Sequence, residues 1–139
     1  MKILLAADGS EYTRKAAAYL ANHLSMLKVK PEVFVHNVHP ALPYASAIAA
    51  VGRKTVEKYQ REEAEKALAV AADEMKKVDC RTSWSVGDAA GELQKFVKKH
   101  KIDLVVMGSR GMSPLKNLAL GSVANKLVSS LDVPVLIVR

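Results

Sequence analysis

Two glycine-containing motifs near the C-terminal end of the chain have the residue types of a phosphate-binding site. The first, Gly108-Ser-Arg-Gly111, follows an apolar run over 104–107, and the second, Gly121-Ser122, opens a predicted helix. Glycine allows a tight turn and a close approach of the backbone to a ligand. A helix N-terminus adds unpaired N–H groups and the positive end of its dipole. We predict a phosphate cradle, with Ser122 as the helix N-cap and as a donor to phosphate. The alternative is that the glycines only serve a tight loop.

Two charged residues accompany these motifs. Asp8 directly follows the first apolar run, where a carboxylate needs water, a donor or a cation. It can accept from a ribose hydroxyl or act as an outer ligand of a phosphate-bound magnesium ion; the alternative is an N-cap of the next helix. Arg110 lies between two glycines and can offer a fork of donors to phosphate oxygens, or remain a solvated loop arginine.

The second predicted strand ends in the polar sequence His36-Asn-Val-His39. The Asn37 amide can read the edge of a base or satisfy backbone groups at the strand end. His36 on a buried strand is typical of a hydrogen-bonded core residue, and His39 is expected to be exposed. No histidine has a cysteine or histidine neighbour at metal-ligand spacing, so we expect no direct metal ligand.

The composition is that of an ordinary folded domain. The chain has 139 residues, 50% of them hydrophobic and 25% charged, and we expect one domain over 1–139. No apolar run reaches the ~18 residues of a membrane span, and the N-terminal residues lack the pattern of a signal peptide. Cys80 is the single cysteine, which excludes a disulfide framework. These features predict a cytoplasmic protein.

The net charge of +7 and the pI near 9.6 raise the question of nucleic-acid binding. However, the lysines between positions 54 and 77 alternate with acidic residues, and the one dense cluster, 98–101, falls at a predicted helix C-terminus. Cations there complement the helix dipole. The seven aromatic residues are not interleaved with basic ones, as they are in single-strand binders. We expect a solvated basic surface and no specific nucleic-acid partner.

Strand and helix patterns alternate along the whole chain, which predicts βαβ units, a parallel sheet and an α/β fold. The run over 81–86 alternates in polarity and is expected to form an edge strand with one covered face. The predicted strands are Lys2–Ala7, Val33–Val38, Arg81–Val86, Leu104–Met107 and Val135–Val138, and the predicted helices are Tyr12–Leu27, Val51–Lys77, Ala89–Lys99 and Ser122–Ser130.

The spacing of the glycine motifs, Gly108-x-x-Gly111-(nine residues)-Gly121-Ser122, resembles the nucleotide-binding signature of the universal stress protein family. The resemblance extends over the whole chain and implies a Rossmann-like, five-stranded open parallel sheet of order 3-2-1-4-5, with helices on both faces. Further segments that carry it are Lys2–Ser10, Gly87-Asp88, Asp103–Gly108 and Val133–Val138.

In that strand order the winding of the sheet reverses between strands 1 and 4, and ligands bind at such a point. The resemblance implies ATP or another adenine nucleotide as the ligand, with magnesium bound through its phosphates, and places the base contact at Asn37. The expected nucleotide-site residues are Ala7, Asp8, Ser10, Asn37, Met107, Gly108, Arg110, Gly111, Gly121, Ser122 and Val123.

Two apolar segments point to further contacts. The stretch 40–52 carries no charge; we expect it to cover the nucleotide crevice or a partner subunit, or else to form a buried start to the second helix. The run Val135-Leu136-Ile137-Val138 has no charged residue before Arg139. An exposed strand of this kind pairs readily with another chain. Together with the resemblance, it predicts a homodimer through this strand.

Three functions remain open on these observations. The first is a dimeric, nucleotide-binding stress-response or signalling module, the second a slow magnesium-dependent ATP hydrolase, and the third a partner-binding stress protein without nucleotide. The chain has no P-loop, no G-x-G-x-x-G motif and no serine with a plausible catalytic triad. A binding module, with no catalytic residue, therefore fits better than an enzyme.

Overall fold

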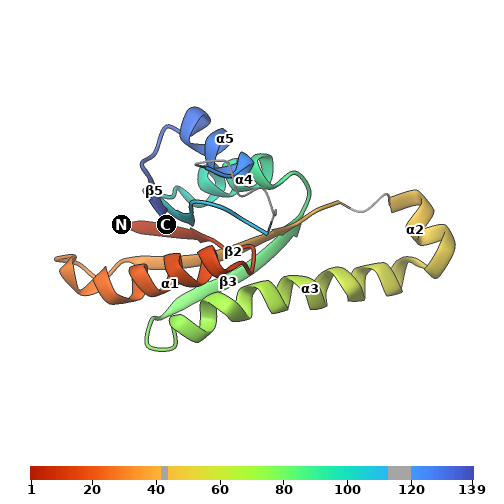
Figure 1. The fold of residues 1–139 in the computed structure, drawn as a ribbon, viewed down its shortest axis with the longest axis horizontal. Coiled ribbons are helices and arrows are strands. Elements are labelled where there is room, and N and C mark those ends of the chain that lie inside the picture. Colours follow the sequence, from red (N-terminus) through yellow and green to blue (C-terminus); the bar gives the residue numbers. More distant parts are fainter. Residues whose placement is uncertain (42–43, 113–119) are drawn as a thin grey trace.

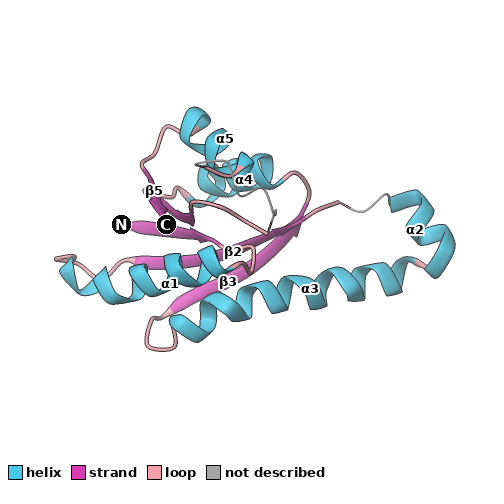
Figure 2. Cartoon of the chain, viewed as in Figure 1, coloured by secondary structure: helices cyan, strands magenta, loops and turns pink. Residues whose placement is uncertain are grey.

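The computed structural model describes residues 1–41, 44–112 and 120–139. Strands and helices alternate along these residues (Figure 1, Figure 2). The strands are β1 (Lys2–Ala6), β2 (Glu32–His39), β3 (Cys80–Val86), β4 (Leu104–Gly108) and β5 (Val135–Val138). The helices are α1 (Glu11–His23), α2 (Tyr44–Val51), α3 (Arg53–Glu74), α4 (Ala89–His100) and α5 (Ser122–Ser130), with a 3-10 turn η1 (Leu24–Met26) after α1.

The five strands form one parallel sheet in the order β3-β2-β1-β4-β5. This confirms the predicted α/β class, the strand order and the edge position of β3. In the register of the sheet, Ala6 at the end of β1 lies opposite His36 of β2 and Met107 of β4. The loops that follow β1 and β4 therefore leave the sheet side by side, at the point where its winding reverses.

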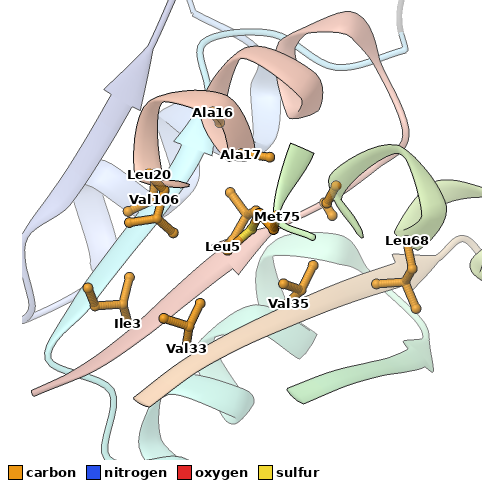
Figure 3. Packing of buried hydrophobic residues seen from close by; sticks show 12 residues of the cluster. Ile3, Leu5, Ala16, Ala17, Leu20, Val33, Val35, Leu68, Met75 and Val106 are labelled. Atoms are coloured by element: carbon orange, nitrogen blue, oxygen red, sulfur yellow. The ribbon is translucent and has the colours of Figure 1, made fainter. Parts of the chain in front are cut away.

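Both faces of the central strands are buried, which explains their continuous apolar sequences. In β1, Ile3 and Leu5 belong to one hydrophobic cluster and Leu4 belongs to the other. The first cluster packs the sheet against α1 and α3, where Leu20 and Leu68 contribute (Figure 3). The second packs the opposite face against α4 and α5. The sheet is thus the middle layer of three.

The prediction of one helix over Val51–Lys77 is wrong at its start. The structure has two helices, α2 and α3, which are separated at Gly52. Gly52 has a φ of +85°, a backbone conformation that favours glycine and interrupts a helix. Figure 1 shows α3 extending past the sheet, with α2 at its far end.

The apolar stretch 40–52 therefore forms mostly helix, while residues 42–43 lie outside the described part. Residues 45, 46 and 49–51 are exposed, so the expected burial of this segment on its own domain is wrong. None of the described residues of the stretch lines the cavity at the sheet end. Within the described residues, no helix combines the length and the apolar character that a membrane crossing requires.

Candidate functional site

A cavity of about 250 Å³ opens at the carboxyl end of the sheet, between the loops after β1 and β4. Nine of the eleven nucleotide-site residues predicted from the sequence line it, and Ser10 and Asn37 do not. The nine are Ala7, Asp8, Met107, Gly108, Arg110, Gly111, Gly121, Ser122 and Val123. Lining residues that the sequence reasoning missed are Ala6, Thr13, His36, Val38, Ala89, Leu93, Met112 and Ala124.

The turn between β1 and α1 fixes the Asp8 carboxylate. Its Oδ1 accepts hydrogen bonds from the Ser10 N–H at 3.0 Å and from the Thr13 hydroxyl at 2.8 Å, and its own N–H donates to Thr13 Oγ1 at 3.0 Å. The N-cap of α1 is Ser10, whose buried hydroxyl oxygen accepts from the Thr13 N–H. The alternative role of Asp8 as this cap is therefore wrong, and hydrogen bonds to the β1–α1 turn orient the exposed Asp8 carboxylate at the cavity.

The two glycine motifs lie in contact with each other. A Cβ on Gly121 would lie 3.4 Å from the Arg110 Cα and 3.7 Å from the Gly111 nitrogen. The Gly121 N–H donates to the Ser109 carbonyl at 2.8 Å, and the Ser109 N–H donates to the Val138 carbonyl at 2.7 Å. These bonds tie both motifs to the end of β5.

Gly111 of the glycine loop lies close to the Asp8 carboxylate. A Cβ at this position would lie only 2.5 Å from Asp8 Oδ2, a separation that real side chains do not adopt. The absence of a side chain at Gly111 therefore allows the loop after β4 to approach the loop after β1. This close approach forms the floor of the cavity.

The start of α5 differs from the prediction in one respect. Its N-cap is Gly121, and Ser122 is the first helical residue, so the prediction of Ser122 as N-cap is wrong. Because glycine has no side chain, this position cannot supply the oxygen that usually accepts from the first helical amides. The N–H groups of Ser122 and Val123, both at the cavity, therefore suit an anion.

The opposite end of the cavity is apolar, with the exception of His36. The His36 ring is buried, contacts the Phe96 ring at 4.4 Å, and has its Nδ1 and Nε2 at 2.9 and 3.0 Å from the hydroxyls of Ser83 and Ser85. Burial lowers the pKa of His36 to about 4, against a smaller opposing effect of the Glu92 charge. The imidazole is neutral at pH 7, and its ring nitrogens are satisfied as expected for a core residue. Apolar lining residues around it include Ala6, Val38, Ala89 and Leu93.

The structure places Asn37 on the other side of the sheet from the cavity-lining His36 and Val38. Its amide nitrogen donates to the Ala7 carbonyl at 2.7 Å, while its buried Oδ1 has no partner among the described residues. Neighbouring residues of a strand face opposite sides, so the lining residues of β2 are the two that flank Asn37. Alternation shows that His36 and Val38 share one face of β2, but not that this face is the one at the cavity.

Arg110 lies at the cavity, and the residues of β5 form an edge of the sheet. The Arg110 side chain is half-buried at the cavity, and its Nη1 lies 3.3 Å from the Tyr12 hydroxyl. Residues Val135–Val138 form the edge strand β5 and are all partly exposed. Hydrogen bonds to β4 satisfy one side of β5, and its other side is the outer edge of the sheet.

Comparison with known proteins gives matches along the entire chain. The model of the universal stress protein family matches residues 1–139. Universal stress protein YxiE of Bacillus subtilis is 32% identical, over 99% of this chain and 98% of the relative. Universal stress protein MJ0531 of Methanocaldococcus jannaschii is 29% identical, over 99% of this chain and 81% of the relative.

Solved structures share the fold. Universal stress protein UspA from Lactobacillus plantarum superposes with a TM-score of 0.83 at 20% identity, covering 100% of this chain and 97% of the other. A universal stress protein solved in complex with cAMP superposes with a TM-score of 0.70 at 22% identity, covering 100% of this chain and 97% of the other. The universal stress protein from Archaeoglobus fulgidus in complex with dAMP superposes with a TM-score of 0.65 at 19% identity, covering 100% of this chain and 98% of the other. The family match over all residues and the 32% identity to YxiE show that this chain belongs to the universal stress protein family.

Proposed function

We propose that this chain binds an adenine nucleotide in the cavity, with ATP and magnesium as the expected ligand, and acts as a dimeric, nucleotide-dependent stress-response or signalling module. One observation carries the proposal. The two glycine motifs touch beside the start of α5, whose N-cap is a glycine. Backbone amides there can surround a phosphate without hindrance from side chains.

The chemistry of the cavity changes from one end to the other in the way a nucleotide requires. The phosphates would lie at the amides of Ser122 and Val123, with the guanidinium of Arg110 as a charged donor. The ribose would lie near Asp8, whose carboxylate is fixed by the β1–α1 turn. The base would fill the apolar end beside Val38, where burial in an apolar environment favours a planar ring.

The residues present also fit a metal that is bound mainly by the ligand. Among the described lining residues, Asp8 is the one with a carboxylate, so the protein offers magnesium at most one acidic side chain there. Magnesium usually combines one or two carboxylates with substrate phosphates and waters. In this proposal the phosphates hold the ion and Asp8 contributes as an outer ligand, while the ion neutralises phosphate charge.

Relatives of the same fold support an adenine nucleotide as the ligand. Universal stress proteins with this fold have been solved in complex with cAMP and with dAMP. Both ligands share an adenine base and a phosphate with ATP. The cavity of this chain has an apolar region that suits the adenine base and backbone amides that suit the phosphate.

The dimer in the proposal rests on β5. This strand lies at the edge of the sheet, and its four apolar side chains are partly exposed. The same strand of a second copy would cover the outer edge about a two-fold axis. Because Val138 accepts from Ser109, which in turn accepts from Gly121, the dimer strand is connected to the phosphate end of the cavity.

The test begins with the purified chain. Nucleotide released on denaturation is measured by absorbance at 260 nm, ATP binding with magnesium by calorimetry, and turnover by phosphate release. Retained or tightly bound ATP without turnover supports the proposal. Steady turnover would favour a slow ATP hydrolase, and no binding of ATP or AMP would favour a partner-binding protein without nucleotide.

A pair of arginine variants makes the test specific for the cavity. Arg110→Ala should weaken ATP binding by on the order of 1–3 kcal/mol, the contribution of a charge-assisted hydrogen bond. Arg81→Ala removes the same charge from β3, where Arg81 pairs with Glu32 at 3.6 Å, and should leave ATP binding unchanged. Equal affinities of both variants and the unaltered chain would remove Arg110 from the site.

A further inference from the structure

The guanidinium of Arg110 rests on a tyrosine from another element. Its Nη1 lies 3.3 Å from the hydroxyl oxygen of Tyr12, and its Cζ lies 5.9 Å from the centre of the Tyr12 ring. Tyr12 is in the first turn of α1 and Arg110 is in the loop after β4. One tyrosine thus offers this arginine both a hydrogen-bond acceptor and the face of an aromatic ring.

The position of Tyr12 is fixed by its backbone. A Cβ on Gly108 would lie 2.5 Å from the Tyr12 Cβ and 2.9 Å from the Tyr12 carbonyl carbon and oxygen. The first turn of α1 therefore packs directly on the end of β4, with no room for a side chain between them. This packing fixes the point on α1 from which the Tyr12 side chain extends toward Arg110.

The same ring holds a second cation. The Lys15 ammonium lies 5.3 Å from the centre of the Tyr12 ring, so one tyrosine contacts both a lysine and the cavity-lining Arg110. Two like charges on one ring repel each other, and an anion with several negative charges relieves that repulsion. A chain of phosphates is such an anion.

We propose that Tyr12 is a positioning residue, which holds the Arg110 guanidinium ready for the phosphates of a nucleoside polyphosphate; this proposal rests on the nucleotide function proposed above. An unsupported arginine loses side-chain entropy when it binds a ligand. Because contact with Tyr12 already restricts the Arg110 side chain, less side-chain entropy is lost when the ligand binds. A guanidinium has five N–H donors, so the bond to Tyr12 does not by itself prevent a bond to phosphate.

The role predicts a specific pattern of affinities. Tyr12→Phe keeps the ring and removes the hydroxyl, and it should weaken ATP binding about threefold to tenfold, the range of one hydrogen bond. Tyr12→Leu removes the ring as well and should approach the affinity of Arg110→Ala. Neither variant should change the affinity for adenosine, which has no phosphate. A general loss of structure would instead weaken ATP and adenosine together.

The experiment measures ATP, AMP and adenosine binding by calorimetry for the full chain and its variants, with thermal unfolding to check folding. Tyr19→Phe is the matched control, because Tyr19 is on the same helix but is exposed and stacks on His23. It should bind ATP like the unaltered chain. In the background of Arg110→Ala, Tyr12→Phe should have no further effect, since its partner is already absent.

Four outcomes would overturn the proposal. They are an unchanged ATP affinity of Tyr12→Phe, equal losses for ATP and adenosine, full additivity with Arg110→Ala, and a gain of ATP affinity. The last would mean that Tyr12 withholds the arginine from the ligand. If the unaltered chain binds neither ATP nor AMP, the proposed function itself fails. That result is distinguishable from the other four, because they all require ATP binding by the unaltered chain.

Discussion

Gly111→Ala should damage the site through one atom, Oδ2 of Asp8. The new Cβ would lie 2.5 Å from that oxygen, whereas contacts become ordinary at 3.4 Å. The carboxylate must therefore move by about 0.9 Å. Such a shift disturbs the two hydrogen bonds that Oδ1 accepts, from the Ser10 N–H and the Thr13 hydroxyl.

The expected cost follows from those two bonds. A hydrogen bond to a charged group contributes about 1.5–3 kcal/mol, and the loss of about one such bond is expected because the carboxylate can rotate in part. Gly111→Ala should thus lower the free energy of unfolding by about 2 kcal/mol. ATP affinity should fall by at least about tenfold, because the floor of the cavity and its carboxylate both move.

A double-mutant cycle in urea unfolding tests whether Asp8 is the cause. In an Asp8→Ala background the clashing oxygen is gone, so Gly111→Ala should cost less than about 0.5 kcal/mol. Asp8→Asn keeps heavy atoms where the carboxylate oxygens were, so in that background the cost should persist. An equal cost of Gly111→Ala in the Asp8→Ala background and in the unaltered chain would refute the reasoning.

The remaining predictions concern the fold, its pH dependence and its assembly. Gly108→Ala would bring a Cβ within 2.9 Å of the Tyr12 backbone, which cannot yield. It should lower the free energy of unfolding, measured in urea, by about 3 kcal/mol. Gly52→Ala is the control, because Gly52 has open space around it and only its φ of +85° opposes a side chain; it should lower the same free energy by about 1 kcal/mol. The pKa of His36 is about 4 in the folded chain and 6.5 ordinarily, so the unfolded chain takes up a proton first, and up to about 3 kcal/mol of stability should be lost as the pH falls from 6.5 to 4. The free energy of unfolding of His36→Gln should therefore fall less between pH 7 and pH 4.5 than that of the unaltered chain. Leu136→Lys places a charge on the outer strand and should yield a monomer in light scattering, whereas a dimer of unchanged mass would exclude this contact.

The strand order and most of the cavity lining could be predicted because they depend on continuous sequence signals. Apart from Lys2 at the start of β1, the runs of β1 and β4 are apolar, which is typical of strands that are buried on both faces. A Cβ at Gly108 or Gly111 would collide with Tyr12 or Asp8, and a Cβ at Gly121 would touch Arg110. Helix α5 and strand β5 were predicted with the bounds that the structure shows.

The errors occur where a local preference is overridden by contacts between distant residues. Serine is favoured as an N-cap, but the hydrogen bond from the Gly121 N–H to Ser109 places the glycine there instead. In β2, every residue from Val33 to Asn37 is buried. Polarity therefore could not show which face Asn37 occupies, and the lining residues His36 and Val38 were missed.

The break between α2 and α3 had no signal in the hydrophobic pattern. Residues on both sides of Gly52 are compatible with a helix, and an isolated glycine is tolerated within one. What ends α2 is the positive φ of Gly52, a property of the folded backbone that the spacing of apolar residues does not reveal.

The central position of β1 also sets the order in which the molecule can assemble. Its first neighbour, β2, follows soon in the chain, but its second neighbour is β4, which begins only at Leu104. Joining segments so distant in sequence is slow, because the entropy of closing the long loop is lost before the contacts form. On the ribosome, β1 keeps an unpaired side until the residues of β4 have also been synthesised. The pairing of β1 with β4, which joins the two halves of the sheet, can therefore form only after β4 has been made.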